Sequence, residues 1–510
     1  MATIARISRQ GLMLCVVAGL LAGCATRPVE QLTQPAFKMP DRFPASGQTP
    51  LANHWWTAFD DDGLNQLIDY ALTHNFTLQS AYARVQQAEA TVAQQRAGLF
   101  PSITGSVSES ATRQSSSGFS FSSNALPGGA NTTGSGFSLD NDEGGTSWSD
   151  DQSIGLSASY EVDLFGRIRN GLAADKLTQR ARQSALQSAA VTLAGNIASQ
   201  WYQYQQYKAQ IKLIRSQIET NQNVLELTTF SFNNGQAAAA DVLRQRQTVA
   251  SSQSQLIQTQ ADLGVARHAL AVLVGRSPSL FDPPAGDLVD LPTLPETGIP
   301  SVSLMRRPDV RQDYFTIAAN SREVAVALAN RYPQLSLSVD YSGGTSTGSL
   351  FSDWILRLGA ELTQPIFDAG QRAAEVRRTR AVVDESVADY QQTLLEALQE
   401  VDDALVNERQ QKDYLAKLDD QLELSDQIVA NLRLRYLRGA TDYLDVLDAL
   451  LNRQQLQQDA LTGRYQLLDY RINLYRALAG PVDTPNIGVG ATPSRRSLND
   501  DNTRQNDTST

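Results

Sequence analysis

Two ten-residue stretches of the chain echo each other: residues 234–243 read NGQAAAADVL and residues 438–447 read RGATDYLDVL. In each stretch a glycine is followed six positions later by Asp-Val-Leu, and the two glycines, Gly235 and Gly439, lie 204 positions apart. A second echo relates residues 75–101 to residues 307–333, and both of these end in an aromatic residue followed by proline. Internal repetition of this kind predicts the architecture, so we expect one helix–strand–strand–helix–helix unit built twice.

Four segments alternate apolar and polar residues with a period of two, as β-strands with one apolar and one polar face do. We expect these strands at residues 101–110 and 152–164 of the first copy and at 333–342 and 353–365 of the second. Strands of about ten residues are long enough to cross a membrane, with one face on lipid and one on water. Four strands cannot close a barrel, so closure requires more than one copy of the chain. A soluble sheet is the alternative, but no amphipathic layer lies nearby in sequence to cover it.

Two long segments without proline, 166–277 and 370–480, each read as a pair of helices that reverse at the glycine. The first helix would span about 65 residues, or about 100 Å, which exceeds ordinary globular helices and indicates coiled packing. Many positions are Gln, Arg, Asp or Glu, which suits helices with one wet side. An ordinary coiled-coil rod is the alternative, but it does not explain the adjacent strands. Apolar residues of the second segment step by four and three, which is a heptad seam, at Val383, Val387, Tyr390, Leu394, Ala397, Val401 and Ala404.

The chain opens with the features of an export signal. A positively charged start precedes a short apolar run at residues 11–21, which is too short to span a membrane comfortably. The run ends in Leu21-Ala22-Gly23-Cys24, which resembles a lipobox, so Cys24 is expected to become the lipidated first residue. Ala25 favours the outer membrane, because aspartate there is the usual inner-membrane retention signal. Cys15 would be removed with the signal, which leaves no disulfide.

Composition sets the remaining boundaries. The link at residues 111–150 is rich in Ser, Gly and Asn and reads as a surface loop. The predicted organisation is a signal peptide at 1–23, an extended proline-rich segment at 24–60, a first repeat at 61–300 that ends in a linker at 278–300, a second repeat at 301–480, and a polar tail at 481–510 that we expect to be disordered.

The bulk composition and the motif search argue against several classes of function. A net charge of −11 without a basic stripe argues against a nucleic-acid partner. The three histidines, His54, His74 and His268, are far apart, so we expect no metal site. The chain contains no catalytic or phosphate-binding motif, so we expect no enzyme and no cofactor apart from the covalent lipid on Cys24.

Taken together, these features resemble the TolC-type outer-membrane factors, in particular the lipidated NodT- or OprM-like branch that serves tripartite drug-efflux pumps. Beside the lipobox and the Asp-Val-Leu turns, the most specific elements are Trp55-Trp56 with Phe59, the two aromatic-proline pairs, and Phe165-Gly166 against Phe367-Asp368-Ala369-Gly370. The resemblance spans nearly all of residues 24–480. It implies an α+β membrane protein in the outer membrane of a Gram-negative bacterium, a homotrimer whose 12-stranded transmembrane β-barrel is continuous with a long periplasmic α-helical coiled-coil tunnel.

The resemblance implies conduction rather than catalysis. The chain would supply the exit duct through which drugs or other small molecules pass from an inner-membrane pump, of the RND type, and a periplasmic adaptor to the outside. Outer-membrane lipid would be a further partner. One alternative is a duct for type I protein secretion, and another is a structural coiled-coil lipoprotein of the envelope without channel activity.

The resemblance also assigns residues to the periplasmic end of the duct. Asp445 and Asp448, three positions apart on one helix face, would line a constriction that favours cations. The first copy has Asp241 and Arg244 at these places and cannot form the same acidic pair. The turns that dock the adaptor would be marked by Gly235, Arg435, Arg438 and Gly439.

A bond between Asp241 and Tyr436 would link neighbouring tip helices in the closed state. A further link of the family uses an arginine at the position of Thr441. Its absence predicts a weaker lock or a substitute such as Arg438.

Overall fold

A computed structural model describes residues 29–115, 146–345 and 353–482 of the chain. The predicted signal peptide, Cys24, most of the predicted loop at 111–150 and most of the predicted tail lie outside these residues. Contacts divide the described chain into two units, which are considered separately below. The first contains residues 93–172 and 322–378, and the second contains residues 29–92, 173–321 and 379–482.

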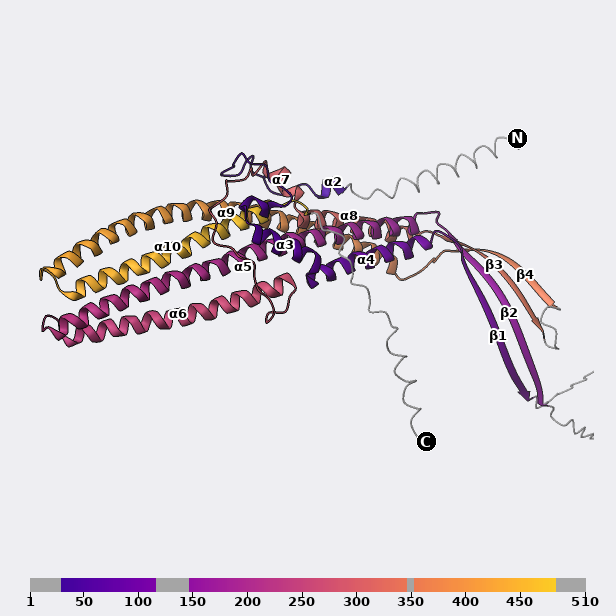
Figure 1. Cartoon of the computed structure of the whole chain (residues 1–510). Coiled ribbons are helices and arrows are strands. Elements are labelled where there is room, and N and C mark those ends of the chain that lie inside the picture. The colour runs from indigo at the N-terminus through magenta and orange to yellow at the C-terminus, as the bar shows by residue number, and fades with distance from the viewer. Residues whose placement is uncertain (1–28, 116–145, 346–352, 483–510) are drawn as a thin grey trace, which may run out of the picture. The chain divides into compact units, whose positions relative to one another are not determined.

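The first unit contains a four-stranded antiparallel sheet in the order β1-β2-β3-β4 (Figure 1). Its strands are β1 (Ser102–Ser115), β2 (Thr146–Val162), β3 (Gln334–Thr345) and β4 (Asp353–Thr363). The first two strands run further than the expected ranges 101–110 and 152–164, so residues 111–115 and 146–150, expected in the loop, are strand. Both strands do so because they pair with each other without interruption, from Ser102 opposite Ser159 to Ser115 opposite Thr146.

The register of the sheet places apolar residues together on one face and small polar residues on the other. Val107 lies opposite Ile154, and Val339 lies between Ala158 and Leu358 in one row across three strands. The apolar face is exposed in the single chain: Val107 is 81% exposed and Leu358 is 75% exposed. Serines dominate the opposite face, at Ser102, Ser106, Ser153, Ser157, Ser159, Ser336 and Ser338.

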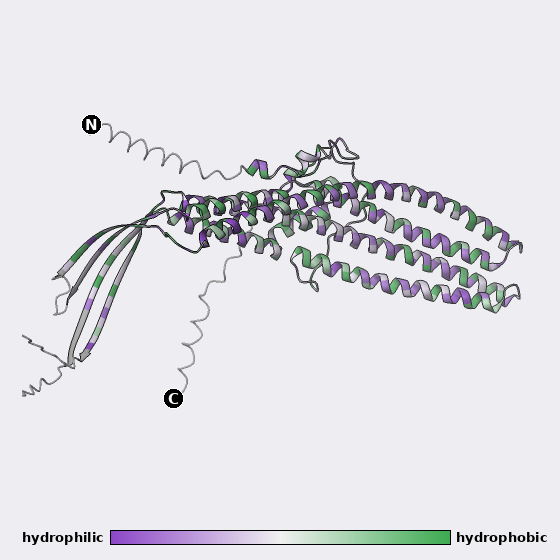
Figure 2. Cartoon of the chain, turned by 180° about the vertical axis from the view of Figure 1, so that it is seen from behind, coloured by the Kyte–Doolittle hydropathy of each residue, from purple (hydrophilic) through white to green (hydrophobic). Residues whose placement is uncertain are grey.

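Long helices make up most of the second unit, and α4, α5, α8 and α9 continue into the first. The matching helices of the two copies have equal lengths: 22 residues in α4 and α8, 67 in α5 and α9, and 36 in α6 and α10. Apolar and polar residues are interleaved along them (Figure 2). The bounds are α2 (Val29–Leu32), η1 (Trp55–Phe59), α3 (Asp62–His74), α4 (Phe76–Ala97), α5 (Arg167–Asn233), α6 (Ala239–Val274), α7 (Pro300–Arg306), α8 (Pro308–Ala329), α9 (Gln371–Leu437) and α10 (Tyr443–Leu478).

None of the helices in the described ranges combines the length and the apolar character that a membrane-spanning helix needs. The predicted heptad seam of α9 is nonetheless an apolar core. Val387 packs at its edge, and the other six positions are buried: Val383, Tyr390, Leu394, Ala397, Val401 and Ala404.

An aromatic cluster forms the other core of the second unit. The buried Trp55 ring stacks on Tyr475 with the ring centroids 5.6 Å apart, and Phe59 packs against Tyr202 at the same distance. The Trp201 Nε1–H donates to the Asp61 carboxylate at 2.8 Å. Asp61 also caps the start of α3. The Trp55-Trp56 motif therefore anchors the extended N-terminal segment against α5 and α10.

A buried ion cluster ties α9 to α10 and to the linker between the copies. Arg471 is fully buried and donates twice to the Glu408 carboxylate at 2.7 Å, while its third nitrogen donates to the Pro292 carbonyl oxygen. Lys412 adds a bond of 2.7 Å to Glu408. Burial alone would raise the pKa of Glu408, but the bonds from Arg471 and Lys412 outweigh it, so this pKa lies below the usual value.

Candidate functional site

The two helix turns have the same backbone geometry. At the first, Gly235 has a φ of 73°, its N–H donates to the Phe232 oxygen at 2.9 Å, and the next N–H donates to the Ser231 oxygen at 2.9 Å. At the second, Gly439 has a φ of 70°, and the equivalent bonds reach Tyr436 and Arg435, also at 2.9 Å. A Cβ at either glycine would meet open space. Positive φ, and not crowding, therefore explains why glycine occupies both turns.

The side chains around the two turns differ. The first turn is flanked by exposed apolar residues, Phe230 and Leu243 among them. The second turn carries the exposed Arg435 and Arg438, as predicted from the sequence. An Arg435 guanidinium nitrogen lies 3.4 Å from the Ala440 oxygen and braces the turn. The second turn also exposes Leu434 and Leu437, so it adds two cations to an apolar surface that the first turn presents without them.

Asp445 and Asp448 are both exposed on the first two turns of α10, as their spacing predicts. The Thr441 hydroxyl donates to the Asp445 carboxylate, so Thr441 holds this acid at the start of the helix. Asp448 lines a groove of about 480 Å³ together with Arg244 of α6 and several amide side chains. Residues at equivalent places in the two copies therefore share one groove with opposite charges.

The predicted link between Asp241 and Tyr436 has no counterpart among the described contacts of the single chain. Asp241 accepts a bond from the Ala238 N–H at 3.2 Å and lies 3.9 Å from the Arg244 guanidinium. The Tyr436 ring instead packs edge-on against Tyr443, with the centroids 6.1 Å apart. The bond between these two tip helices in the closed state stays a prediction.

Sequence reasoning missed a ladder of buried amides that joins α10 to α5 and α6. It placed glutamines on wet helix faces, but Gln217, Gln245 and Gln454 are buried, as is Asn221. Their polar atoms are satisfied by one another across helices. The contacts of this amide ladder are Gln245 Nε2 to the backbone carbonyl oxygen of Asn221 (2.7 Å), Gln454 Nε2 to Asn221 Oδ1 (2.9 Å), Gln217 Nε2 to the backbone carbonyl oxygen of Gln454 (3.1 Å) and Gln458 Nε2 to Gln217 Oε1 (2.9 Å).

Tyr443 begins the amide ladder at the turn, where its hydroxyl donates to Gln245. Burial raises the pKa of the Tyr443 phenol to about 12, so it keeps its proton at neutral pH. The sequence signal for the amide ladder is weak, because a Gln or Asn in a helix can face either water or another amide.

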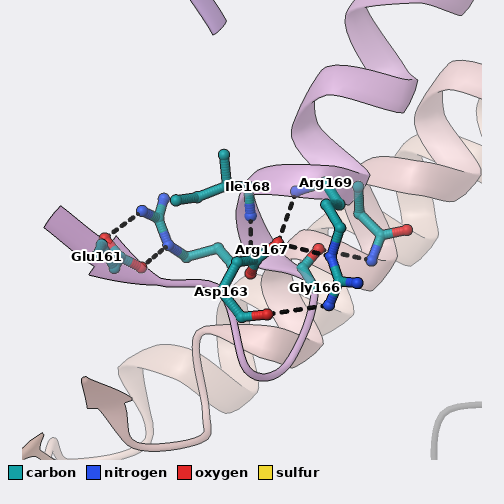
Figure 3. Close-up of polar contacts among 7 residues, drawn as sticks. Glu161, Asp163, Gly166, Arg167, Ile168 and Arg169 are labelled. Carbon is teal, nitrogen blue, oxygen red and sulfur yellow. Dashed lines mark hydrogen bonds and ion pairs between the residues drawn. The ribbon is translucent and has the colours of Figure 1, made fainter. Parts of the chain in front are cut away.

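The connection from β2 to α5 is held by two carboxylates (Figure 3). Asp163 accepts from the N–H groups of Ile168 and Arg169 at 3.2 and 2.9 Å, and Glu161 binds the Arg167 guanidinium at 3.0 and 2.7 Å. Gly166 makes the bend with a φ of 75°. In the second copy Asp368 accepts from the N–H groups of Gly370 and Arg372 before α9, at 2.9 and 3.3 Å. A carboxylate cap therefore fixes both strand-to-helix connections.

The chain matches one family of proteins over most of its length. The model of the outer membrane efflux protein family matches residues 67–276 and 299–480, which include both helix turns and all four strands.

Relatives of known name agree with this match. The probable efflux pump outer membrane protein TtgC of Pseudomonas putida is 29% identical over 484 residues, which cover 92% of this chain and 95% of the relative. The cation efflux system protein CusC of Escherichia coli is 27% identical over 486 residues, covering 91% and 98%. Among solved structures, the outer-membrane channel OprN aligns with a TM-score of 0.75 and 27% identity over 89% of this chain and 100% of that one.

Proposed function

The chain belongs to the outer membrane efflux protein family, and from that membership we propose that three copies form the exit duct of a tripartite efflux system. The protein is an outer-membrane efflux channel of a Gram-negative bacterium. Beyond this, we propose a trimer, a closed barrel, a duplicated unit and roles for single residues.

Two observations support a closed barrel: the exposed apolar face of the sheet and its two open edges. Within the described residues β1 pairs with β2 alone and β4 pairs with β3 alone, so each copy presents two open sheet edges. Open edges cannot stand in lipid, because their backbone groups would lack partners. Pairing β4 of one copy with β1 of the next satisfies both edges, and three copies then supply twelve strands.

The helices supply the periplasmic part of the proposed duct. The equal lengths of α5 and α9, and of α6 and α10, support a duplicated unit. Three copies of these two helical hairpins would form a coiled-coil tunnel. The lipid on Cys24 would attach the chain to the membrane beside the barrel.

The helix turns are the proposed docking points for the adaptor, through Gly235 and Gly439 with Arg435 and Arg438. We expect an inner-membrane pump of the RND type behind the adaptor. Drugs or other small molecules are the proposed cargo. Rings formed by Asp445 and Asp448 would favour cations at the narrow end, because like charges in a narrow pore act on every passing ion.

Planar-bilayer recording of the purified full-length protein, with chemical cross-linking beside it, tests the proposal. We expect stepwise conductance, a cross-linked trimer and a β-oligomer that heat dissociates. A coiled-coil lipoprotein would give neither conductance nor a heat-sensitive oligomer. Co-purification with an ABC-type secretion partner instead of an RND pump would favour the protein-secretion alternative.

A further inference from the structure

The four connections between helices and strands share a composition that the proposed duct does not explain. Each carries an aromatic residue and at least one arginine at the same end of the sheet. The pairs are Phe100 with Arg96 before β1, Phe165 with Arg167 and Arg169 after β2, Tyr332 with Arg331 before β3, and Phe367 with Arg372 after β4.

The apolar side chains of these connections are exposed. Ile366 is 98% exposed, Phe367 is 88% exposed and Phe100 is 62% exposed. Phe165 and Tyr332 stack on each other, with the ring centroids 4.7 Å apart, so the aromatic residues of two connections make one surface. These residues follow directly from the exposed apolar face of the sheet and extend it to its helical end.

The connections are also rich in positive charge, although the whole chain has a net charge of −11. They contain eight arginines and four acidic residues, counted over 93–101, 163–172, 322–333 and 364–378. This excess of cations lies at the end of the sheet where the exposed aromatic residues lie.

The arginines nearest the strands fall into two groups according to the direction of the chain. Where a helix begins, they are held by carboxylates, as Arg167 is by Glu161 and Arg169 by Asp163 (Figure 3). Where a helix ends, Arg96 and Arg331 are exposed, and neither has a carboxylate partner among the described residues. Two guanidinium groups next to the strands are therefore available to an external anion in each copy.

We propose that Arg96 and Arg331 bind the phosphate groups of anionic phospholipids in the leaflet on the periplasmic side, with Phe100 and Tyr332 in the interface. Aromatic residues concentrate at membrane interfaces, and the planar guanidinium matches phosphate oxygens in a two-point contact. The inference rests on the proposed function, because the barrel orientation sets which leaflet the connections meet. Three copies would place six such arginines around the barrel.

Lipid titration of the full-length trimer in detergent, followed by native mass spectrometry, tests the arginines. Phosphatidylglycerol and phosphatidylcholine are the probes, and Arg96→Gln/Arg331→Gln is the variant. We expect the wild type to prefer phosphatidylglycerol and the variant to lose about 30-fold of that preference, because each arginine near an anionic surface contributes about fivefold. Arg246→Gln/Arg464→Gln removes the same charge from exposed helix positions elsewhere and should keep the preference. No preference in the wild type, or equal loss in both variants, would overturn the proposal.

A second measurement asks whether the connections face lipid at all. Phe100→Trp in vesicles of brominated phosphatidylcholine should gain tryptophan quenching relative to the wild type, since bromine quenches by contact. If the connection faces the lumen or a neighbouring copy, the added tryptophan is not quenched, and the proposal fails. Bilayer conductance measured on the same preparations separates this failure from a failure of the duct itself, because a lumen-facing connection would leave conductance unchanged.

Discussion

The α5–α6 turn at Gly235 and the α9–α10 turn at Gly439 close with the same pair of backbone bonds, yet one presents Phe230 and Leu243 and the other presents Arg435 and Arg438. The shared backbone geometry is what the helical reversal requires, and the different side chains are where a binding partner could distinguish the two turns. Positive φ is required twice and glycine is present twice, while the surrounding surface has diverged. The same divergence recurs deeper in the hairpins, where equivalent positions hold different polar groups.

The largest expected effect comes from the buried ion cluster. Arg471 has Glu408 as its partner, whereas the equivalent positions of the first hairpin are Arg267 and Tyr204, and Arg267 Nε has no partner among the described residues. Glu408→Gln leaves a buried guanidinium without its counter-charge and should cost about 3–5 kcal/mol of stability. Tyr204→Phe, the matched control, should cost less than about 1 kcal/mol. Thermal unfolding of the solubilised oligomer measures both, and equal losses would contradict the difference between the hairpins.

The same cluster predicts a dependence of stability on pH. Because the pKa of Glu408 is lowered in the folded protein, its contribution is present above the ordinary glutamate pKa and is lost as pH falls through the lowered value. Glu408→Gln should therefore unfold with a weaker dependence on acid than the wild type. Unfolding midpoints measured down to the acid range test this, and parallel curves for the two proteins would count against it.

The amide ladder gives the next largest effect. Asn221→Leu removes the partner of the Gln454 side chain and leaves a buried amide unpaired, which should cost about 2 kcal/mol. The equivalent residue of the second hairpin is Ser425, which is buried. Ser425→Ala should cost less than about 1 kcal/mol. Denaturant or thermal midpoints compare the stability of the two variants. A larger loss of stability from Ser425→Ala than from Asn221→Leu would contradict the role given to the amide ladder.

The glycines should show equal and smaller effects. Gly235→Ala and Gly439→Ala each force a side chain into positive φ in otherwise open space, at a cost of about 1 kcal/mol. Limited proteolysis at the two turns reports the loosening. Equal cleavage is expected if the backbone requirement is the same, and a strong inequality would show that one turn is held by its side chains.

The smallest expected effects concern the electrical properties of the duct. Asp445→Asn/Asp448→Asn should reduce cation preference, measured from reversal potentials in bilayers, because only the second copy carries this acidic pair. Asp241→Asn is the matched control from the first copy and should change the preference less. Unchanged preference in both variants would place these carboxylates away from the constriction.

The predicted bond between Asp241 and Tyr436 has its own test. Tyr436→Phe and Asp241→Ala should each raise the closed-state conductance if the bond between the two side chains helps to hold the tunnel shut. If neither variant changes it, the closed state is held by other contacts, for which the amide ladder is the first candidate.

Much of this architecture could be predicted from the sequence, because periodicity reports directly on local structure. The alternation in Leu335 to Tyr341 predicts a two-faced strand, and the steps from Val383 to Ala404 predict the buried seam of α9. The glycine echo locates both helix reversals. Family membership, the efflux function and the outer-membrane location were predicted and are confirmed by the comparisons.

The polar interior could not be predicted, because its pairings join residues far apart in the chain. Asn221 and Gln454 are 233 positions apart, and neither carries a local signal that the other lies opposite. The partner of Asp241 is a similar case: local geometry gives it the Ala238 N–H, whereas the predicted bond to Tyr436 joins two helices far apart in the chain. Apolar patterning is a property of one segment, and polar satisfaction is a property of several.

The serine-rich face of the sheet has a consequence for what passes along it. In the proposed barrel this face is the wall of the bore. Asp340 lies beside Arg357 in the register, and Glu161 and Glu361 flank Ser336 on the same face, so the wall carries an excess of acidic residues. Hydroxyls offer an apolar drug no surface on which to adhere and offer a charged one little to repel it. Neutral cargo would therefore dwell only briefly on such a wall, whereas the acidic residues would disfavour anions, so the throughput of neutral and cationic cargo would depend on how fast the barrel is filled.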